Sequence, residues 1–286
     1  REDYMYRSIC EALEGSSLSA YEVFGAHPDD NGVRFTVYAP NAVSVAVIGD
    51  FNGWTDSLMV RTDNGVWTSY VNGAKQGDLY KYRIKTADGE VFDRADPFAF
   101  FSEKRPDTAS VVYDIGGYEW TDSDWVKKRS KNFSAPLNIY EVHAGSWKKK
   151  SGEFMTYTEL ADELIPYTME IGATHIELLP ITEHPFDGSW GYQSAGYFSA
   201  TSRYGNPHGL MQFIDRCHSE GIGVILDWVP GHFCRDSHGL AAFNGHKLYE
   251  IDDHQEWGTY KFDLGRPEVQ SFLVSNLIYG HIGVKQ

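Results

Sequence analysis

The sequence predicts a multidomain fold of the β plus α/β class: an immunoglobulin-like β-sandwich followed by the first part of a (β/α)8 TIM barrel. Three observations predict it. The chain first alternates apolar and polar residues in short runs, then becomes polar, and then alternates apolar strands with helical patterns. Its 286 residues leave room for two domains of ordinary size.

A short helical pattern occupies residues 1–20, and the sandwich is expected at 21–120. Residues 33–39 alternate with period two and end at a Pro-Asn turn. Further alternating runs lie between turns rich in Gly, Asn and Asp, at 43–47, 67–71, 80–85 and 111–113. Short alternating runs between such turns are typical of antiparallel sandwiches.

A polar segment, residues 121–136, is interpreted as a linker, and residues 137–286 as a truncated barrel of three strand-helix units. The expected strands, 137–142, 174–179 and 222–226, are strongly apolar, as in a parallel sheet covered on both faces. Helical patterns follow at 158–171, from Asn206-Pro207, and from Pro267. Pro166 must kink or split the first of these helices.

The loops favour a barrel over a doubly wound sheet. Connections after the strands are long and rich in Trp, Tyr, His and Asp, whereas those before the strands are short. Barrel enzymes carry their sites at the carboxyl ends of the strands, and no Gly-rich phosphate loop follows the first strand. We therefore expect function at that edge.

The composition narrows the classes of partner that the protein could bind. The formal charge of 25 − 40 = −15 disfavours nucleic acid and anionic membranes, and suits a neutral substrate. Three widely spaced cysteines, no apolar run of membrane-spanning length and no signal pattern predict a cytoplasmic protein. We expect no cofactor and a monomer.

Two segments could bind one small ligand together. Asp227 ends the third parallel strand, and His232 follows on the loop; the alternative is a turn cap and an ordinary loop histidine. Tyr192 sits beside a tryptophan and a glycine after the second strand, and could present a flat face to a ligand or pack as a lid. Glu141 and His143 share one side of the first strand, but the other histidines are too scattered to predict a metal site.

Several motifs resemble the 1,4-α-glucan (glycogen) branching enzymes of the α-amylase superfamily. The matching barrel segments are residues 140–143 (Tyr-Glu-Val-His), 177–180, 183–193, 201–205 and 227–232 (Asp-Trp-Val-Pro-Gly-His). Upstream, residues 35–42 and 49–54 resemble the glycogen-binding β-sandwich that precedes such barrels.

The resemblance implies a glycosyltransferase of glycogen biosynthesis that cleaves an α-1,4-glucan and transfers the segment to a 6-hydroxyl by retaining double displacement. By position, Tyr192 resembles the family's stacking platform, His232 the imidazole that binds sugar hydroxyls, and Asp227 the aspartate that organises the pocket. The family's nucleophile lies in a Gly-x-Arg-x-Asp segment, which these residues do not contain. We therefore expect all three catalytic carboxylates to lie beyond this chain, so that no residue in it is catalytic and the chain alone is inactive.

In the sandwich, Trp54 and Lys81 resemble sugar-contacting positions of related glycogen-binding modules, and Val91 stands near the place of a second tryptophan found in them. The alternative is that Trp54 packs under its own turn.

Two other functions remain open for the protein: a non-catalytic glucan-binding protein, and a debranching enzyme of the same superfamily.

Overall fold

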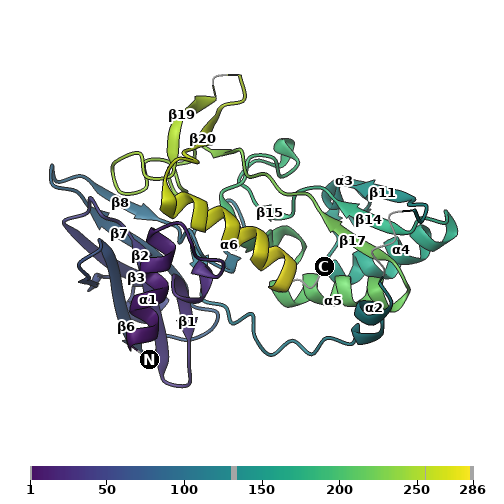
Figure 1. Ribbon diagram of the computed structural model, residues 1–286, viewed down its shortest axis with the longest axis horizontal. Helices are drawn as coiled ribbons and strands as arrows, with labels where there is room; N and C mark the ends of the chain where they lie inside the picture. The colour runs from purple at the N-terminus through teal and green to yellow at the C-terminus, as the bar shows by residue number, and fades with distance from the viewer. Residues whose placement is uncertain (1, 130–133, 255, 284–286) are drawn as a thin grey trace.

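The computed structural model describes residues 2–129, 134–254 and 256–283. The β-sandwich lies at one end of the molecule, the parallel strands lie at the other, and helix α6 (Pro267–Gly283) runs between them (Figure 1). The predicted order of a sandwich followed by part of a barrel is confirmed.

Two antiparallel sheets make the sandwich. The first has the order β1-β2-β6-β5: β1 (Gly25–Pro28), β2 (Gly32–Tyr38), β6 (Val66–Asn72) and β5 (Val60–Arg61). The second has the order β4-β3-β7-β10-β9, with β8 paired to β7: β4 (Ser57–Leu58), β3 (Ser44–Gly49), β7 (Leu79–Lys85), β10 (Ser110–Val111), β9 (Phe101–Ser102) and β8 (Val91–Arg94). The alternation expected for residues 33–39 is real, because Val33, Phe35 and Val37 are buried in the core with Tyr80 and Tyr82.

The first and last helices pack together beside the sandwich. Helix α1 (Glu2–Leu13) contacts α6, and the segment after α1, with η1 (Ala20–Glu22), is held by serines of α6. The Ala20 amide donates to Ser275 Oγ at 2.9 Å. Phe272 of α6 belongs to the sandwich-side core. The sequence places α6 as the third barrel helix, but its apolar side chains pack mainly against the sandwich side.

The predicted linker contains a short helix, α2 (Ser123–Lys128). Trp125 stacks on His218 of helix α5 (Pro207–Ser219), with ring centroids 5.0 Å apart, and buried Asp122 pairs with the same imidazole at 3.0 Å. This part of the linker is therefore docked on α5. Residues 130–133 of the linker, and residues 1 and 284–286 at the ends of the predicted domains, lie outside the described residues.

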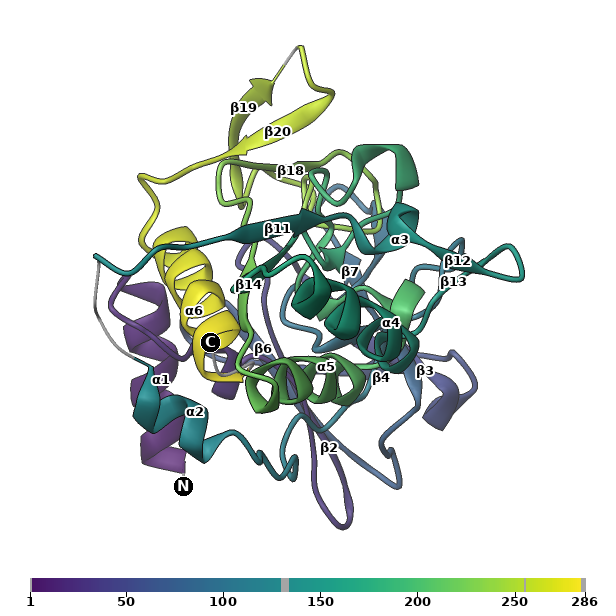
Figure 2. The ribbon, with the colours of Figure 1, turned by 90° about the vertical axis from the view of Figure 1, so that its right-hand side faces the viewer.

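Three parallel strands form the start of the barrel. They are β11 (Ile139–Val142), β14 (His175–Leu178) and β17 (Gly223–Leu226), in that order, with Val142, Leu178 and Leu226 level with one another. Helices α4 (Tyr157–Glu170) and α5 (Pro207–Ser219) bury their apolar faces in a second core with these strands. Figure 2 views the molecule from the side of these strands, with α4 and α5 close together below β11 and β14.

Local signals fix the two helices. Thr156 and Glu159 form a capping box at the start of α4, and Asn206 accepts the Gly209 amide at 2.8 Å at the start of α5, as its Asn-Pro sequence predicts. Pro166 does not split α4, which runs as one helix past it. The buried apolar face of α4 stabilises the helix despite the one backbone hydrogen bond that a proline removes.

Short elements fill the remaining loops of the sandwich and of the barrel part. They are η2 (Asp50–Asn52), α3 (Ala144–Trp147), β12 (Lys149–Lys150), β13 (Glu153–Phe154), β15 (Thr182–Glu183), η3 (Asp187–Ser189), β16 (Gly196–Ala200), η4 (Ser202–Tyr204), β18 (His232–Cys234), β19 (Glu250–His254) and β20 (Thr259–Phe262). Among the described helices, none has the length and apolar character needed to cross a bilayer.

Candidate glucan-binding site

The site forms at the carboxyl edge of the parallel sheet. Asp227 directly follows β17, and its amide donates to the Leu178 carbonyl of β14 at 3.0 Å. His143 directly follows β11, on the other side of β14. Because parallel strands end at one edge, side chains from three separate loops meet there. The sequence predicts this edge as the place of function.

The loop after β14 brings Tyr192 back over this edge. Gly191 adopts φ +90°, and a Cβ at this position would lie 2.2 Å from the Pro180 carbonyl oxygen. Only glycine allows the backbone to pass so close to the end of the strand segment. The turn thus fixes where the next residue, Tyr192, presents its ring.

Hydrogen bonds join the three residues that the sequence assigns to the barrel site. The Tyr192 hydroxyl donates to Asp227 Oδ2, and His232 Nε2 lies 3.0 Å from the Tyr192 carbonyl oxygen. All three side chains are at least partly open to solvent. The structure therefore brings Tyr192, Asp227 and His232 into one cluster.

Electrostatics set the protonation states of Tyr192 and His232. Partial burial, followed by the hydrogen bond to Asp227, raises the pKa of Tyr192 to about 12. Partial burial lowers the pKa of His232, although its contact with the Tyr192 carbonyl opposes this. At neutral pH the phenol is therefore a donor and the imidazole is neutral, a combination suited to hydroxyl groups.

His232 is positioned by a buried tyrosine and a small sheet. The hydroxyl of Tyr197, whose ring is buried, lies within hydrogen-bond distance of the Val229 carbonyl at 3.1 Å and donates to the His232 carbonyl at 2.7 Å. His232 begins β18, which pairs antiparallel with β20. The imidazole therefore projects from a backbone that is hydrogen-bonded on both sides.

Buried Arg203 anchors the loop that carries Tyr192 through two ion pairs. Its guanidinium binds Glu183 Oε1 and Asp187 Oδ1, each at 2.8 Å, and its side chain is only 2% exposed. Asp187 also pairs with Arg105, from the segment between β9 and β10 of the sandwich. One carboxylate thus links the sandwich, the barrel and the loop that carries Tyr192.

Trp190 extends the aromatic surface. Its indole is 51% exposed and stacks on His143, with ring centroids 5.2 Å apart at 11°. Partial burial lowers the pKa of His143. The sequence places His143 and Glu141 on one side of the first strand without predicting a metal site, and in the structure the His143 ring supports a tryptophan.

A hollow opens beside Tyr192, and we call it the Tyr192 hollow. Its lining residues are Ser189, Tyr192, Gln193, His232, Trp257 and Thr259. Sequence reasoning missed Trp257, because residues 250–262 read only as part of a long loop. The signal that could have found it is the alternation on both sides of Trp257-Gly258, which is typical of a hairpin.

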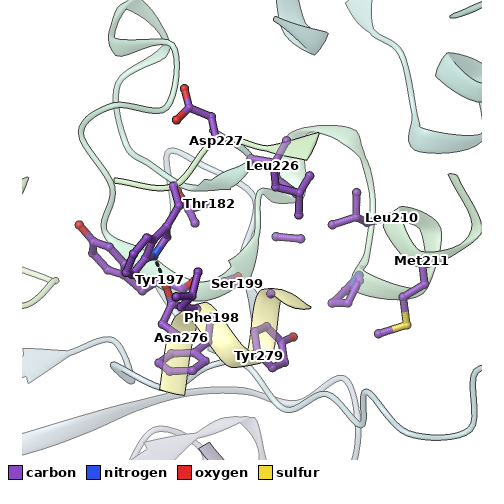
Figure 3. A pocket seen from close by; sticks show the side chains of 16 residues that line it. Thr182, Tyr197, Phe198, Ser199, Leu210, Met211, Leu226, Asp227, Asn276 and Tyr279 are labelled. Carbon is purple, nitrogen blue, oxygen red and sulfur yellow. Dashed lines mark hydrogen bonds between the residues drawn. The ribbon is translucent and has the colours of Figure 1, made fainter. Parts of the chain in front are cut away.

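A second cavity borders Asp227 and lies between α5, β16, β17 and α6 (Figure 3). Its lining is mainly apolar, with polar groups on Thr182, Ser199, Asn276, Asp227 and the tyrosines Tyr197 and Tyr279. It is not lined by Tyr192 or His232, which line the open hollow instead. The open hollow is therefore the candidate sugar site.

The sandwich residues are placed separately. Trp54, 38% exposed, follows η2 at φ 62°, and its indole donates to Asp50 Oδ1 at 3.1 Å. Lys81 donates to Thr108 Oγ1 at 2.7 Å. No hydrogen bond or ring contact joins these two side chains in the part of the chain that the structure describes. Val91 is exposed on β8.

Across residues 2–129, 134–254 and 256–283, no three His, Cys, Asp or Glu side chains converge as metal ligands would. The site as described is thus one of aromatic rings, hydroxyls, an imidazole and a carboxylate. Flat rings beside such groups are suited to a sugar, whose ring has apolar faces and a polar rim.

Comparison with known proteins shows which families the chain is similar to. Residues 23–99 match the family described as Carbohydrate-binding module 48 (Isoamylase N-terminal domain), and residues 161–269 match the family described as Alpha amylase, catalytic domain. The fold is similar to a putative alpha amylase from Salmonella typhimurium (TM-score 0.74, 23% identity, 91% of this chain and 42% of that one). It is also similar to a pullulanase from Anoxybacillus sp. LM18-11 (TM-score 0.72, 21% identity, 91% and 43%).

These matches define the class: a carbohydrate-binding module followed by part of an α-amylase-type catalytic domain. Within it, the chain is 56% identical to the 1,4-alpha-glucan branching enzyme GlgB of Geobacillus stearothermophilus, over 93% of this chain and 44% of the relative. It is 51% identical to the enzyme of the same name from Bacillus subtilis, over 93% of this chain and 45% of that relative. The predicted relationship to the 1,4-α-glucan branching enzymes is confirmed, and the chain spans less than half the length of these relatives.

Proposed function

We propose that this chain carries the carbohydrate-binding module and the substrate-binding edge of a 1,4-α-glucan branching enzyme. The observation that carries the proposal is the hydrogen-bonded cluster of Tyr192, Asp227 and His232 at the carboxyl edge of the parallel sheet. In this proposal the Tyr192 ring stacks on a glucose unit, and Asp227 and His232 bind its hydroxyls.

The reaction itself needs a carboxylate nucleophile and a carboxylic acid that protonates the leaving oxygen. The chain contains no Gly-x-Arg-x-Asp segment, where the resemblance places the nucleophile. Its proposed part in catalysis is therefore to hold the glucan, and we expect these 286 residues alone to be inactive on amylose.

The test uses the gene that encodes this chain, read through to its stop codon. The expressed protein should reduce the iodine stain of amylose and introduce α-1,6 linkages, and Tyr192→Ala should abolish both effects. The 286-residue chain should leave the stain unchanged. A Tyr192→Ala protein with full branching activity would refute the proposed role of the cluster.

A second candidate function is glucan binding by the sandwich, favoured by the exposed indole of Trp54 on its fixed turn. Retardation of the chain in a glycogen-containing gel, lost in Trp54→Ala, would support it.

We propose a cytoplasmic monomer with no nucleic-acid or membrane partner. The three cysteines, Cys10, Cys217 and Cys234, are all unpaired, as a reducing compartment favours.

A further inference from the structure

Trp257 presents a large apolar side chain at the surface beside the proposed site. It lies in the turn between β19 and β20, a hairpin that projects from the body of the protein (Figure 1). Its indole is 54% exposed, although burial of an aromatic ring is favourable. An indole held at a surface in this way needs a reason.

The indole is fixed in place. It stacks on His254, with ring centroids 4.0 Å apart at 7°, and meets the edge of His232 at 5.2 Å. Gln193 Nε2 donates to the Trp257 carbonyl at 3.2 Å, so the residue next to Tyr192 holds the turn. One face of the indole is covered by His254, and the exposed area therefore includes the opposite face.

The hairpin is itself tied to the site. His254 pairs with Thr259 across the hairpin, and β20 pairs with β18, whose first residue is His232. Trp257 therefore keeps a fixed register with the proposed sugar-binding imidazole. Both residues line the Tyr192 hollow.

The hollow also holds an unused polar group. Within the described residues, the buried Thr259 Oγ1 has no hydrogen-bond partner. Buried hydroxyls usually have partners, so this one suits a water or a ligand hydroxyl in the hollow. An exposed aromatic face together with polar groups is the combination that sugar rings require.

We infer that Trp257 is a second stacking platform, which binds a glucose unit of the same α-1,4-glucan chain that the Tyr192 cluster holds. This inference rests on the proposed function. It assigns the β19–β20 hairpin to substrate binding and makes Trp257 a determinant of affinity for longer glucans.

The test measures maltoheptaose affinity by calorimetry for the full chain, in a Trp54→Ala background that removes the sandwich platform. Trp257→Ala should weaken binding about tenfold, because a lost aromatic contact is worth roughly 1.4 kcal/mol. Trp257→Phe should restore most of the affinity. The matched control is Trp125→Ala, which removes a tryptophan that also stacks on a histidine but lies outside the hollow, and should leave affinity unchanged.

A second readout distinguishes direct sugar binding by Trp257 from a purely structural role. The indole N–H signal of Trp257, assigned by its loss in Trp257→Phe, should shift during the titration while that of Trp125 stays. Unchanged affinity in Trp257→Ala together with weak binding by Tyr192→Ala would overturn this inference and leave the proposed function intact. Unchanged affinity in both variants, or no binding by the parent, would overturn both.

Discussion

The phenol hydroxyl of Tyr192 donates a hydrogen bond to the carboxylate of Asp227, although 35 residues separate them in the sequence. The two side chains come from loops that follow neighbouring parallel strands, β14 and β17. This hydrogen bond orients the Tyr192 ring and occupies one oxygen of the Asp227 carboxylate. One contact therefore fixes the positions of both the stacking ring and the carboxylate.

Tyr192→Phe separates these two roles. The ring remains, so stacking is kept, but Asp227 loses its donor and the ring its orientation. We expect weaker maltoheptaose binding than in the parent, stronger binding than in Tyr192→Ala, and a loss of about 1 kcal/mol in the free energy of unfolding. Calorimetry and urea denaturation measure the two effects. Equal affinity of Tyr192→Phe and Tyr192→Ala would show that the ring itself contributes nothing.

Gly191→Ala tests how the platform is placed. Its new Cβ would lie 2.2 Å from the Pro180 carbonyl oxygen at a φ of +90°, so the loop must move and carry Tyr192 with it. We expect maltoheptaose binding to fall as far as in Tyr192→Ala. Gly231→Ala is the matched control beside His232, because a Cβ there meets nothing within 4 Å. If Gly191→Ala bound as the parent does, the loop would not need its observed path.

Arg203→Met tests the anchor under the loop. It leaves buried Glu183 without its cation, and removing one partner of a buried pair costs about 3 kcal/mol of unfolding free energy. Because Asp187 is released as well, binding should weaken. The control is Arg216→Met, whose pair with Asp162 is exposed and should cost less than about 1 kcal/mol. Similar losses in the two variants, measured by urea denaturation, would argue against a buried anchor.

His184 gives the site a pH dependence of stability. Burial, and then the nearby Arg203 charge, lower the pKa of His184 from 6.5 to about 4. A depressed folded-state pKa means that its contribution is present above pH 6.5 and is lost as the pH falls through about 4. Compared with His184→Asn, the parent should lose about 1.4 kcal/mol per pH unit across that range. Unfolding curves at several pH values measure this difference, and parallel pH profiles would contradict it.

Local patterns predicted the elements that local physics determines. The alternation at 33–39 predicted β2, and the Asn206-Pro207 pair predicted the start of α5. Pro166 was predicted to kink or split its helix, and the split does not occur, because burial of the other residues of α4 outweighs one missing hydrogen bond. The packing of α6 beside α1 depends on contacts across more than 250 residues, such as that between Ser271 and Glu11, and no local pattern contains them.

The site shows the same division. Strand ends in a parallel sheet meet at one edge, so the sequence could place Tyr192, Asp227 and His232 on that edge before any coordinates. Their roles in binding remain predictions. The hairpin that carries Trp257 could have been predicted from its alternation, but its place beside His232 could not, because it depends on the pairing of β20 with β18, a register that no single segment encodes.

The central claim is that the Tyr192 cluster holds an α-1,4-glucan. A crystal structure of the chain with maltoheptaose tests it most directly. We predict a glucose ring stacked on the face of Tyr192, with its hydroxyls on Asp227 and His232. Maltoheptaose bound to the sandwich alone, with the Tyr192 hollow empty at saturating ligand, would contradict the claim.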